Sequence, residues 1–203
     1  MGEGRLNPWR TRVVPAAAVG AAGNRSCFGQ AKGRKPAEAS IVRPEDIDFH
    51  SNALREAALL AQENVRQGKG GPFGAVIARE RKVIAQGVNR VTVQLDPTAH
   101  AEIEAIRAAA LLLGTFDLRG CVLYTSSYPC PMCLGAIYWA RLDEVFFGSS
   151  TEDVAHAGFR DALLYREFQS PPRERRLRLV AIDSPECREA FALWSNSPNK
   201  VWY

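Results

Sequence analysis

Two short stretches decide the fold of this chain: TAHAE at residues 98–102 and PCPMC at residues 129–133. Each stretch opens a segment whose apolar residues recur at helical spacing, which predicts that each lies at a helix N-terminus. Pro131 fits the first turn of a helix, where its missing backbone N–H is not needed. The two stretches therefore bring a histidine, a glutamate and two cysteines to the starts of two helices.

The spacing of these residues is that of a catalytic zinc site. Such a site uses three protein ligands and keeps a fourth position for water, and His100, Cys130 and Cys133 supply one imidazole and two thiolates. Cysteines one turn apart at a helix N-terminus can reach a single ion, and the helix dipole favours their thiolate form. Glu102 can stand beside the metal without binding it. There it can take a proton from the metal-bound water and pass it to a ring nitrogen and then to a leaving amine.

Either motif alone has simpler explanations. A C-x-x-C pair is also found as a redox pair or as half of a structural zinc site, and H-x-E occurs by chance on many helices. Five cysteines, an odd number, argue against a disulfide scaffold. The two motifs together match the signature of zinc-dependent nucleobase deaminases, so we predict one catalytic zinc ion per chain.

The rest of the chain alternates between helical and strand patterns. Helices are predicted over residues 47–67, 98–113, 132–141, 151–168 (with a break at Gly158) and 185–194, and strands over residues 73–78, 83–88, 121–125, 143–148 and 177–182. Residues 89–98 are polar and irregular. This alternation predicts an α/β fold, a three-layer α/β/α sandwich with helices on both faces of one sheet.

The net charge of +4 is concentrated at the N-terminus. Residues 1–40 hold seven basic and two acidic residues, whereas residues 41–203 hold 19 basic and 20 acidic residues. A nearly neutral body does not favour a nucleic-acid partner. The longest apolar stretches, residues 13–22 and 108–113, are too short for the roughly 20 residues that a membrane-spanning helix needs. We therefore expect neither nucleic acid nor membrane as a partner, and a cytoplasmic location.

Residues 1–40 are rich in Ala, Gly, Arg and Pro and lack periodicity, so we predict a disordered basic extension. A secretory signal, an organelle transit peptide and a misassigned start codon remain open alternatives for this segment. Residues 41–203 are predicted to form one catalytic domain, including a C-terminal lid segment.

Residues 50–203 resemble the bacterial guanine deaminases of the zinc-dependent cytidine-deaminase superfamily. The resemblance is carried by GGPFGAVI at residues 70–77, DPTAHAEI at residues 96–103, LYTS at residues 123–126 and the segment over residues 129–141. AGF at residues 157–159 with Asp161, and the terminal NKVWY at residues 199–203, also match.

This resemblance implies a mixed five-stranded sheet, hydrolytic deamination of guanine to xanthine in purine catabolism, and a homodimer with an exchanged C-terminal segment. It assigns Asn89 to hold the purine ring, Asp161 to contact the amidine edge of guanine, and Phe73 to the wall under the base. Tyr203 would cover the pocket of the other subunit. Three of these residues also have a plain structural explanation: a turn for Asn89, a helix cap for Asp161 and a frayed end for Tyr203.

Three positions depart from the family pattern. Ser127 and Tyr128 stand where the family usually has Cys-Glu, and Arg160 stands where it usually has Asp. Tyr128 replaces a carboxylate by a bulky phenol beside the metal motif, which would change the hydrogen bonds that support the metal ligands and the shape of the pocket. Arg160 introduces a positive charge next to Asp161, which would lower the pKa of Asp161 or pair with it.

Several other functions remain open on the sequence. A transfer-RNA adenosine deaminase shares both zinc motifs, and a guanosine or cytidine deaminase would differ in how Tyr203 closes the pocket. A non-catalytic zinc module for binding is the alternative from another class. The intact Glu102 argues against that last function, because a structural zinc site needs no acid–base residue.

Overall fold

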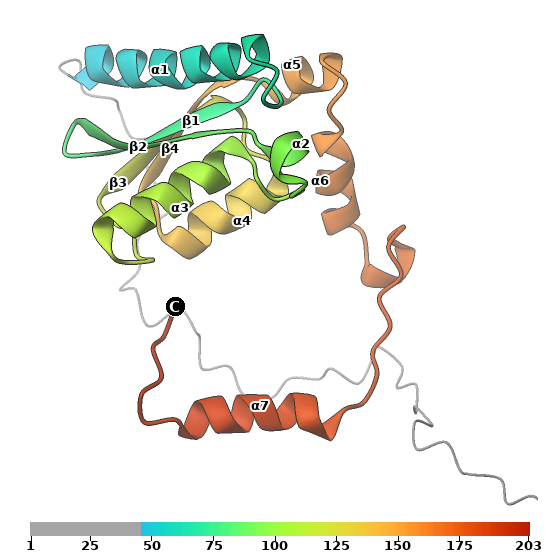
Figure 1. Ribbon diagram of the computed structural model, residues 1–203. Coiled ribbons are helices and arrows are strands. Elements are labelled where there is room, and N and C mark those ends of the chain that lie inside the picture. Colours follow the sequence, from blue (N-terminus) through green and yellow to red (C-terminus); the bar gives the residue numbers. More distant parts are fainter. Residues whose placement is uncertain (1–45) are drawn as a thin grey trace, which may run out of the picture. The chain divides into compact units, whose positions relative to one another are not determined.

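The computed structural model describes residues 46–203 (Figure 1). The predicted basic extension of residues 1–40 lies outside the described residues. Within the described part, the chain divides into two units: one ends at Gln169 and the other is Ser170–Trp202, with Tyr203 grouped with the first.

The first unit contains a mixed four-stranded sheet. Its strands are β1 (Gly74–Arg79), β2 (Lys82–Val88), β3 (Cys121–Ser127) and β4 (Glu144–Ser149), in the spatial order β2-β1-β3-β4. β1 pairs antiparallel with both β2 and β3, whereas β3 and β4 run parallel. The helices of this unit are α1 (Ile47–Arg66), α2 (Val91–Gln94), α3 (Ala101–Leu113), α4 (Pro131–Ala140), α5 (Thr151–His156) and α6 (Asp161–Gln169).

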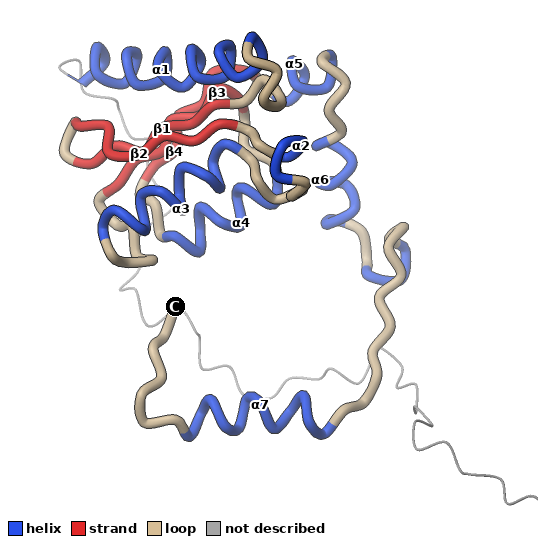
Figure 2. Tube along the Cα trace, in the orientation of Figure 1, coloured by secondary structure: helices blue, strands red, loops and turns tan. Residues whose placement is uncertain are grey.

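Helices cover both faces of the sheet. α1 lies on one face, and α3 and α4 lie side by side on the other (Figures 1 and 2). β1 is buried on both faces because it is a central strand: Ile77 packs into the cluster under α3 and α4, while Val76 packs into the cluster under α1. The predicted three-layer α/β/α arrangement of this unit is confirmed.

Small residues let the helices approach the sheet closely. α1 buries Ala53, Ala57 and Ala61 at spacings of four residues, and α3 buries Ala101, Ala105 and Ala109 in the same way. On the sheet side, β2 has a glycine at the point where α3 comes closest: a Cβ on Gly87 would lie 2.2 Å from the carbonyl oxygen of Ala101. This contact seats the first turn of α3, which bears the predicted metal motif, directly on β2.

The predicted fifth strand is not formed. Within the described residues the sheet has four strands, and residues 177–182 contain only an isolated bridge residue in an extended segment (Figure 2). A strand needs a neighbouring strand to satisfy its backbone groups, and this segment belongs to the separate unit Ser170–Trp202. Its apolar side chains, among them Leu177, Leu179 and Ile182, are exposed.

The unit Ser170–Trp202 contains a short 3₁₀ helix, Pro172–Glu174, and α7 (Pro185–Asn196). The hydroxyl of Ser184 caps α7 by accepting the backbone N–H of Cys187. Nowhere between residues 46 and 203 is a helix long and apolar enough to cross a membrane.

Most predicted boundaries agree with the structure to within three residues. The break at Gly158 separates α5 from α6, with Gly158 at φ +92°. One short helix was missed: α2 lies inside the stretch predicted to be irregular, and it ends at Leu95 in the left-handed conformation.

The close approach at Gly87 gives a stability prediction. We expect Gly87→Ala to lower the free energy of unfolding by about 2 kcal/mol or more, because the new Cβ meets backbone atoms that cannot move alone. Gly135→Ala, in α4, is the control: nothing lies within 4 Å of its Cβ, and alanine favours helix by up to about 1 kcal/mol. Urea denaturation measures both variants. Equal stabilities for the two variants would contradict this packing.

Candidate functional site

The predicted metal ligands meet at the N-termini of two helices. His100 is the N-cap residue of α3 and Cys130 is the N-cap residue of α4, both with extended backbone. Neither side chain caps its own helix, so both are available to a metal. Pro131 occupies the first helical position of α4, as predicted, and places Cys133 in the first turn.

The ligand atoms have the spacing of a tetrahedral zinc site. Nδ1 of His100 lies 3.7 Å from Sγ of Cys130 and 3.5 Å from Sγ of Cys133. Zinc–nitrogen and zinc–sulfur bonds of ordinary length at a tetrahedral angle put the two ligand atoms about 3.6 Å apart. Within the described residues these three form a group that can hold a metal ion, since their ligand atoms all lie within 4.8 Å of one another. The donor set therefore fits zinc.

The electrostatics of the site favour an anionic sulfur at Cys130. In the chain by itself the pKa of Cys130 is lowered to about 4, first because Cys133 donates a hydrogen bond to its sulfur and then because His100 does. The pKa of Cys133 is raised because it keeps the shared proton and is buried. The positive N-terminal end of α4 adds to the stabilisation of negative charge at both sulfurs.

Glu102 lies beside the metal ligands and away from water. Its side chain is in the first turn of α3, and only 4% of the residue is exposed. Burial raises the pKa of Glu102, and the nearby charge of Cys130 raises it further. A carboxyl group with a raised pKa holds and releases a proton more readily near neutral pH, which is the property that an acid–base residue needs.

The backbone holds one end of the Asn89 amide and leaves the other end free of these contacts. Its Oδ1 accepts hydrogen bonds from the backbone N–H groups of Gly71, at 3.2 Å, and Val91, at 3.3 Å. This leaves Nδ2 as the end that can donate to a ligand. The arrangement suits recognition of a ring nitrogen or carbonyl oxygen, which accept hydrogen bonds.

Asn64 holds the loop that contains Asn89. The sequence analysis did not identify Asn64 as a residue of the site. Its Nδ2 donates to the carbonyl oxygens of Gly71, at 2.9 Å, and Asn89, at 2.8 Å. A signal was present: Asn64 continues the buried stripe of α1 formed by Ala53, Ala57 and Ala61. A polar residue at a buried helical position must have a partner, so this spacing could have identified it.

Phe73 and Asp161 lie on segments that converge near the metal motif. The ring of Phe73 packs edge-on against Phe159, with centroids 4.7 Å apart, and Asp161 begins α6 two residues later. The pKa of Asp161 is raised by partial burial first and by the charge of Cys130 second. That effect of Cys130 links Asp161 electrostatically to the metal ligands.

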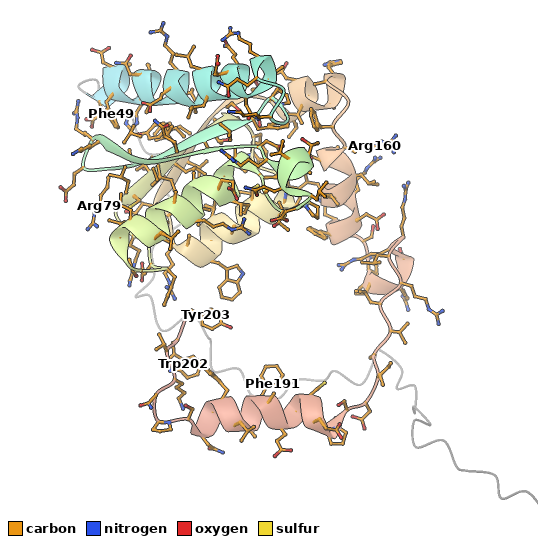
Figure 3. All side chains as sticks on the ribbon, viewed as in Figure 1. Phe49, Arg79, Arg160, Phe191, Trp202 and Tyr203 are labelled. Carbon is orange, nitrogen blue, oxygen red and sulfur yellow. The ribbon has the colours of Figure 1, made fainter. Side chains whose placement is uncertain are left out.

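Arg160 does not act on Asp161 as the sequence suggested. No ion pair joins the two side chains in the described part of the chain, and the pKa of Asp161 is raised rather than lowered. The side chain of Arg160 is exposed and points to solvent (Figure 3). The side chains of adjacent residues at the start of a helix point in different directions. The arginine at position 160 therefore forms no ion pair with Asp161, although it replaces the aspartate usual in the family.

Tyr203 is not brought to the metal ligands within one chain. Its ring is 69% exposed and lies beside the rings of Phe116 and Trp139. Phe116 follows the C-terminal end of α3 and Trp139 lies at the C-terminal end of α4, whereas the metal ligands are at the N-terminal ends of these helices.

A groove of about 510 Å³ adjoins Phe73 and is lined mostly by α1, α5 and the end of β3. None of the described residues that line it is a metal ligand, Glu102, Asn89 or Asp161. We therefore do not identify this groove with the pocket for a substrate.

The ligand geometry predicts how zinc content responds to substitution. Purified protein should carry about one zinc ion per chain, and Cys130→Ala should lose it because two ligands hold zinc far more weakly than three. Cys187→Ala should retain zinc, since Cys187 is exposed and outside the cluster. Metal analysis of dialysed protein measures this. Full zinc in Cys130→Ala would refute the ligand set.

Comparison with known proteins agrees with this site. Guanine deaminase of Bacillus subtilis is 48% identical over 154 residues, which cover 76% of this chain and 99% of that protein. The X-ray structure of that enzyme superposes with a TM-score of 0.74 and covers 76% of this chain and 98% of its own. The transfer-RNA-specific adenosine deaminase of Haemophilus influenzae is 38% identical over 124 residues, or 61% of this chain and 69% of that protein.

The cytidine and deoxycytidylate deaminase zinc-binding region matches residues 47–149, which span all four strands and all three metal ligands. On this match, and on the identity to the Bacillus subtilis enzyme, the chain belongs to the zinc-binding cytidine and deoxycytidylate deaminase family.

Proposed function

We propose that this chain catalyses the hydrolytic deamination of guanine to xanthine and ammonia. The observation that carries the proposal is the three-ligand cluster beside a buried Glu102, in a chain 48% identical to guanine deaminase of Bacillus subtilis over nearly all of that enzyme. Three protein ligands leave one position open, which distinguishes a catalytic zinc site from a structural one.

Glu102 acts as the proton carrier of the reaction. A zinc ion held by His100, Cys130 and Cys133 supplies a Lewis acid that makes water more acidic at neutral pH. Glu102 takes a proton from the attacking water and delivers it to a ring nitrogen of the base, and a proton then passes to the departing amine. The balance is guanine plus water giving xanthine plus ammonia, so no other co-reactant is needed.

Asn89 and Asp161 recognise the base from two sides. Asn89 donates through Nδ2, because its oxygen is held by backbone N–H groups. Asp161 accepts from N1–H and the exocyclic amine of guanine, a pair of donors that adenine does not present. Phe73, which is held against Phe159, forms the wall under the ring.

The active enzyme is a homodimer in which the C-terminal segment covers the site of the partner subunit. The unit Ser170–Trp202 exposes Leu177, Phe191 and Trp202, and the first unit exposes Leu111 and Trp139. Apolar exposure of this kind on two separate parts of a chain is typical of surfaces that are covered in an assembly. Tyr203, which does not reach the metal ligands in its own chain, would close the partner's pocket.

The reaction takes place in the cytoplasm, where thiol ligands stay reduced. Transfer-RNA adenosine is the less favoured substrate, because residues 41–203 have nearly balanced charge and the similarity to the adenosine deaminase covers less of the chain.

An ammonia-release assay tests the substrate and the role of Glu102 together. Wild-type protein should turn over guanine faster than guanosine, adenine, cytosine or transfer RNA. Glu102→Gln should keep its zinc and lose about a hundredfold or more in kcat, because the amide cannot carry the proton. Faster release from cytosine or transfer RNA would reject guanine as the substrate, and no release from any of them would indicate a binding module.

Subunit mixing tests whether the C-terminal segment is exchanged. Glu102→Gln and a chain ending at Asn199 should each be nearly inactive. When the two chains are co-expressed and pair at random, about half of the dimers are mixed, and one of the two sites in each mixed dimer has both Glu102 and the partner's Tyr203. The whole mixture should therefore recover about a quarter of wild-type activity. Mixtures that remain inactive, or a shortened chain with unchanged kinetics, would refute exchange of a functional lid.

A further inference from the structure

Helix α6 carries Asp161 in its first turn but has little core contact to hold it. None of the residues of α6, all of which the structure describes, is buried. The packing of Phe159 on Phe73 holds the loop that leads into the helix. Because no residue of α6 is buried, individual polar and ring contacts along the helix set its direction.

Tyr165 makes such a contact. Its hydroxyl donates a hydrogen bond of 2.7 Å to the carbonyl oxygen of Pro129, the residue that precedes the metal ligand Cys130. The pKa of Tyr165 is raised, first by burial and then by the neighbouring Tyr128 and the charge of Cys130. The hydroxyl therefore stays protonated and available as a donor.

Tyr128 supports the ring of Tyr165 from the sheet. Its ring lies T-shaped against Phe147 of β4, with centroids 5.0 Å apart, and 6.2 Å from the ring of Tyr165. The glutamate usual at this position in the family that the sequence resembles could not make these ring contacts. The departure at Tyr128 thus has a structural role: it completes an aromatic cluster of Tyr128, Phe147 and Tyr165.

Asp161 and Tyr165 are four residues apart and therefore lie on the same face of α6. An anchor at Tyr165 fixes where Asp161 stands with respect to the metal ligands. We propose that Tyr165, supported by Tyr128, is a positioning residue that holds Asp161 in place for recognition of the guanine edge. This inference rests on the proposed function and adds Tyr165 and Tyr128 to the residues that determine which base is bound.

Tyr165→Phe in the full-length protein is the direct test, because it removes one hydroxyl and keeps the ring. We expect KM for guanine to rise about fivefold, in the range of one ordinary hydrogen bond, with kcat changed less than about twofold. Zinc should remain at about one ion per chain. Tyr138→Phe is the matched control, since its side chain is 78% exposed on α4, and it should leave both constants unchanged.

The ring contacts of Tyr128 are tested separately. Tyr128→Phe keeps the ring contacts and removes only the hydroxyl, which also interacts with Tyr165, so it should raise KM less than Tyr128→Ala. Tyr128→Ala should raise KM by a similar factor to Tyr165→Phe. If Tyr128 served only the stability of the fold, both Tyr128→Ala and Tyr128→Phe would lower the free energy of unfolding. Neither variant would then raise KM without also changing kcat.

Amide hydrogen exchange tests, in the absence of substrate, whether the Tyr165 hydrogen bond holds α6. Exchange over residues 161–169 should be faster in Tyr165→Phe than in wild type, with exchange in α3 unchanged. If wild-type protein does not deaminate guanine, the proposed function fails and the recognition role falls with it. If it does, wild-type values of KM and α6 exchange in Tyr165→Phe overturn this inference alone. Loss of zinc together with kcat also overturns it, since the hydrogen bond would then serve the metal ligands.

Discussion

The structure depends on one constraint: the N-termini of α3 and α4 must meet so that an imidazole and two thiolates reach one point. The tertiary packing under these helices serves this constraint. Gly87 seats the start of α3 on β2, and the buried alanines of α3 keep the helix close to the sheet. The positive N-terminal ends of both helices then lie at the ligand cluster, which lowers the cost of placing thiolates at two buried cysteines. The packing that places the starts of α3 and α4 side by side is therefore also what brings the metal ligands together.

The site joins groups from distant parts of the sequence by short polar links. Asn64 on α1 holds the loop that presents Asn89, and Tyr165 ties α6, which carries Asp161, to the carbonyl oxygen of Pro129. Each link uses a side chain that bonds to a main-chain carbonyl, so it fixes a position rather than taking part in the reaction. In our account, Glu102 and the metal ligands carry out the chemistry, and these links determine which base fits.

The sequence predicted the metal ligands, Glu102 and most element boundaries because each has a local signal. Helix periodicity, a first-turn proline and the spacing of His100, Cys130 and Cys133 need no knowledge of distant contacts. The prediction of a fifth strand was wrong because strand pairing is not local: residues 177–182 have strand character, yet among the described residues they join none of the four strands of the sheet. Tyr165 was missed for the same reason, since its partner Pro129 is far away in the sequence. Asn64 was missed although its place on the buried stripe of α1 indicated a buried polar contact.

Zinc X-ray absorption spectroscopy of the purified protein tests the central claim most directly, because it reports the atoms bound to the metal. Our account predicts two sulfur neighbours at about 2.3 Å, and one nitrogen and one further light atom at about 2.0–2.1 Å, the last of them exchangeable solvent. Four protein ligands, or a shell without two sulfurs, would contradict a catalytic zinc centre built from His100, Cys130 and Cys133.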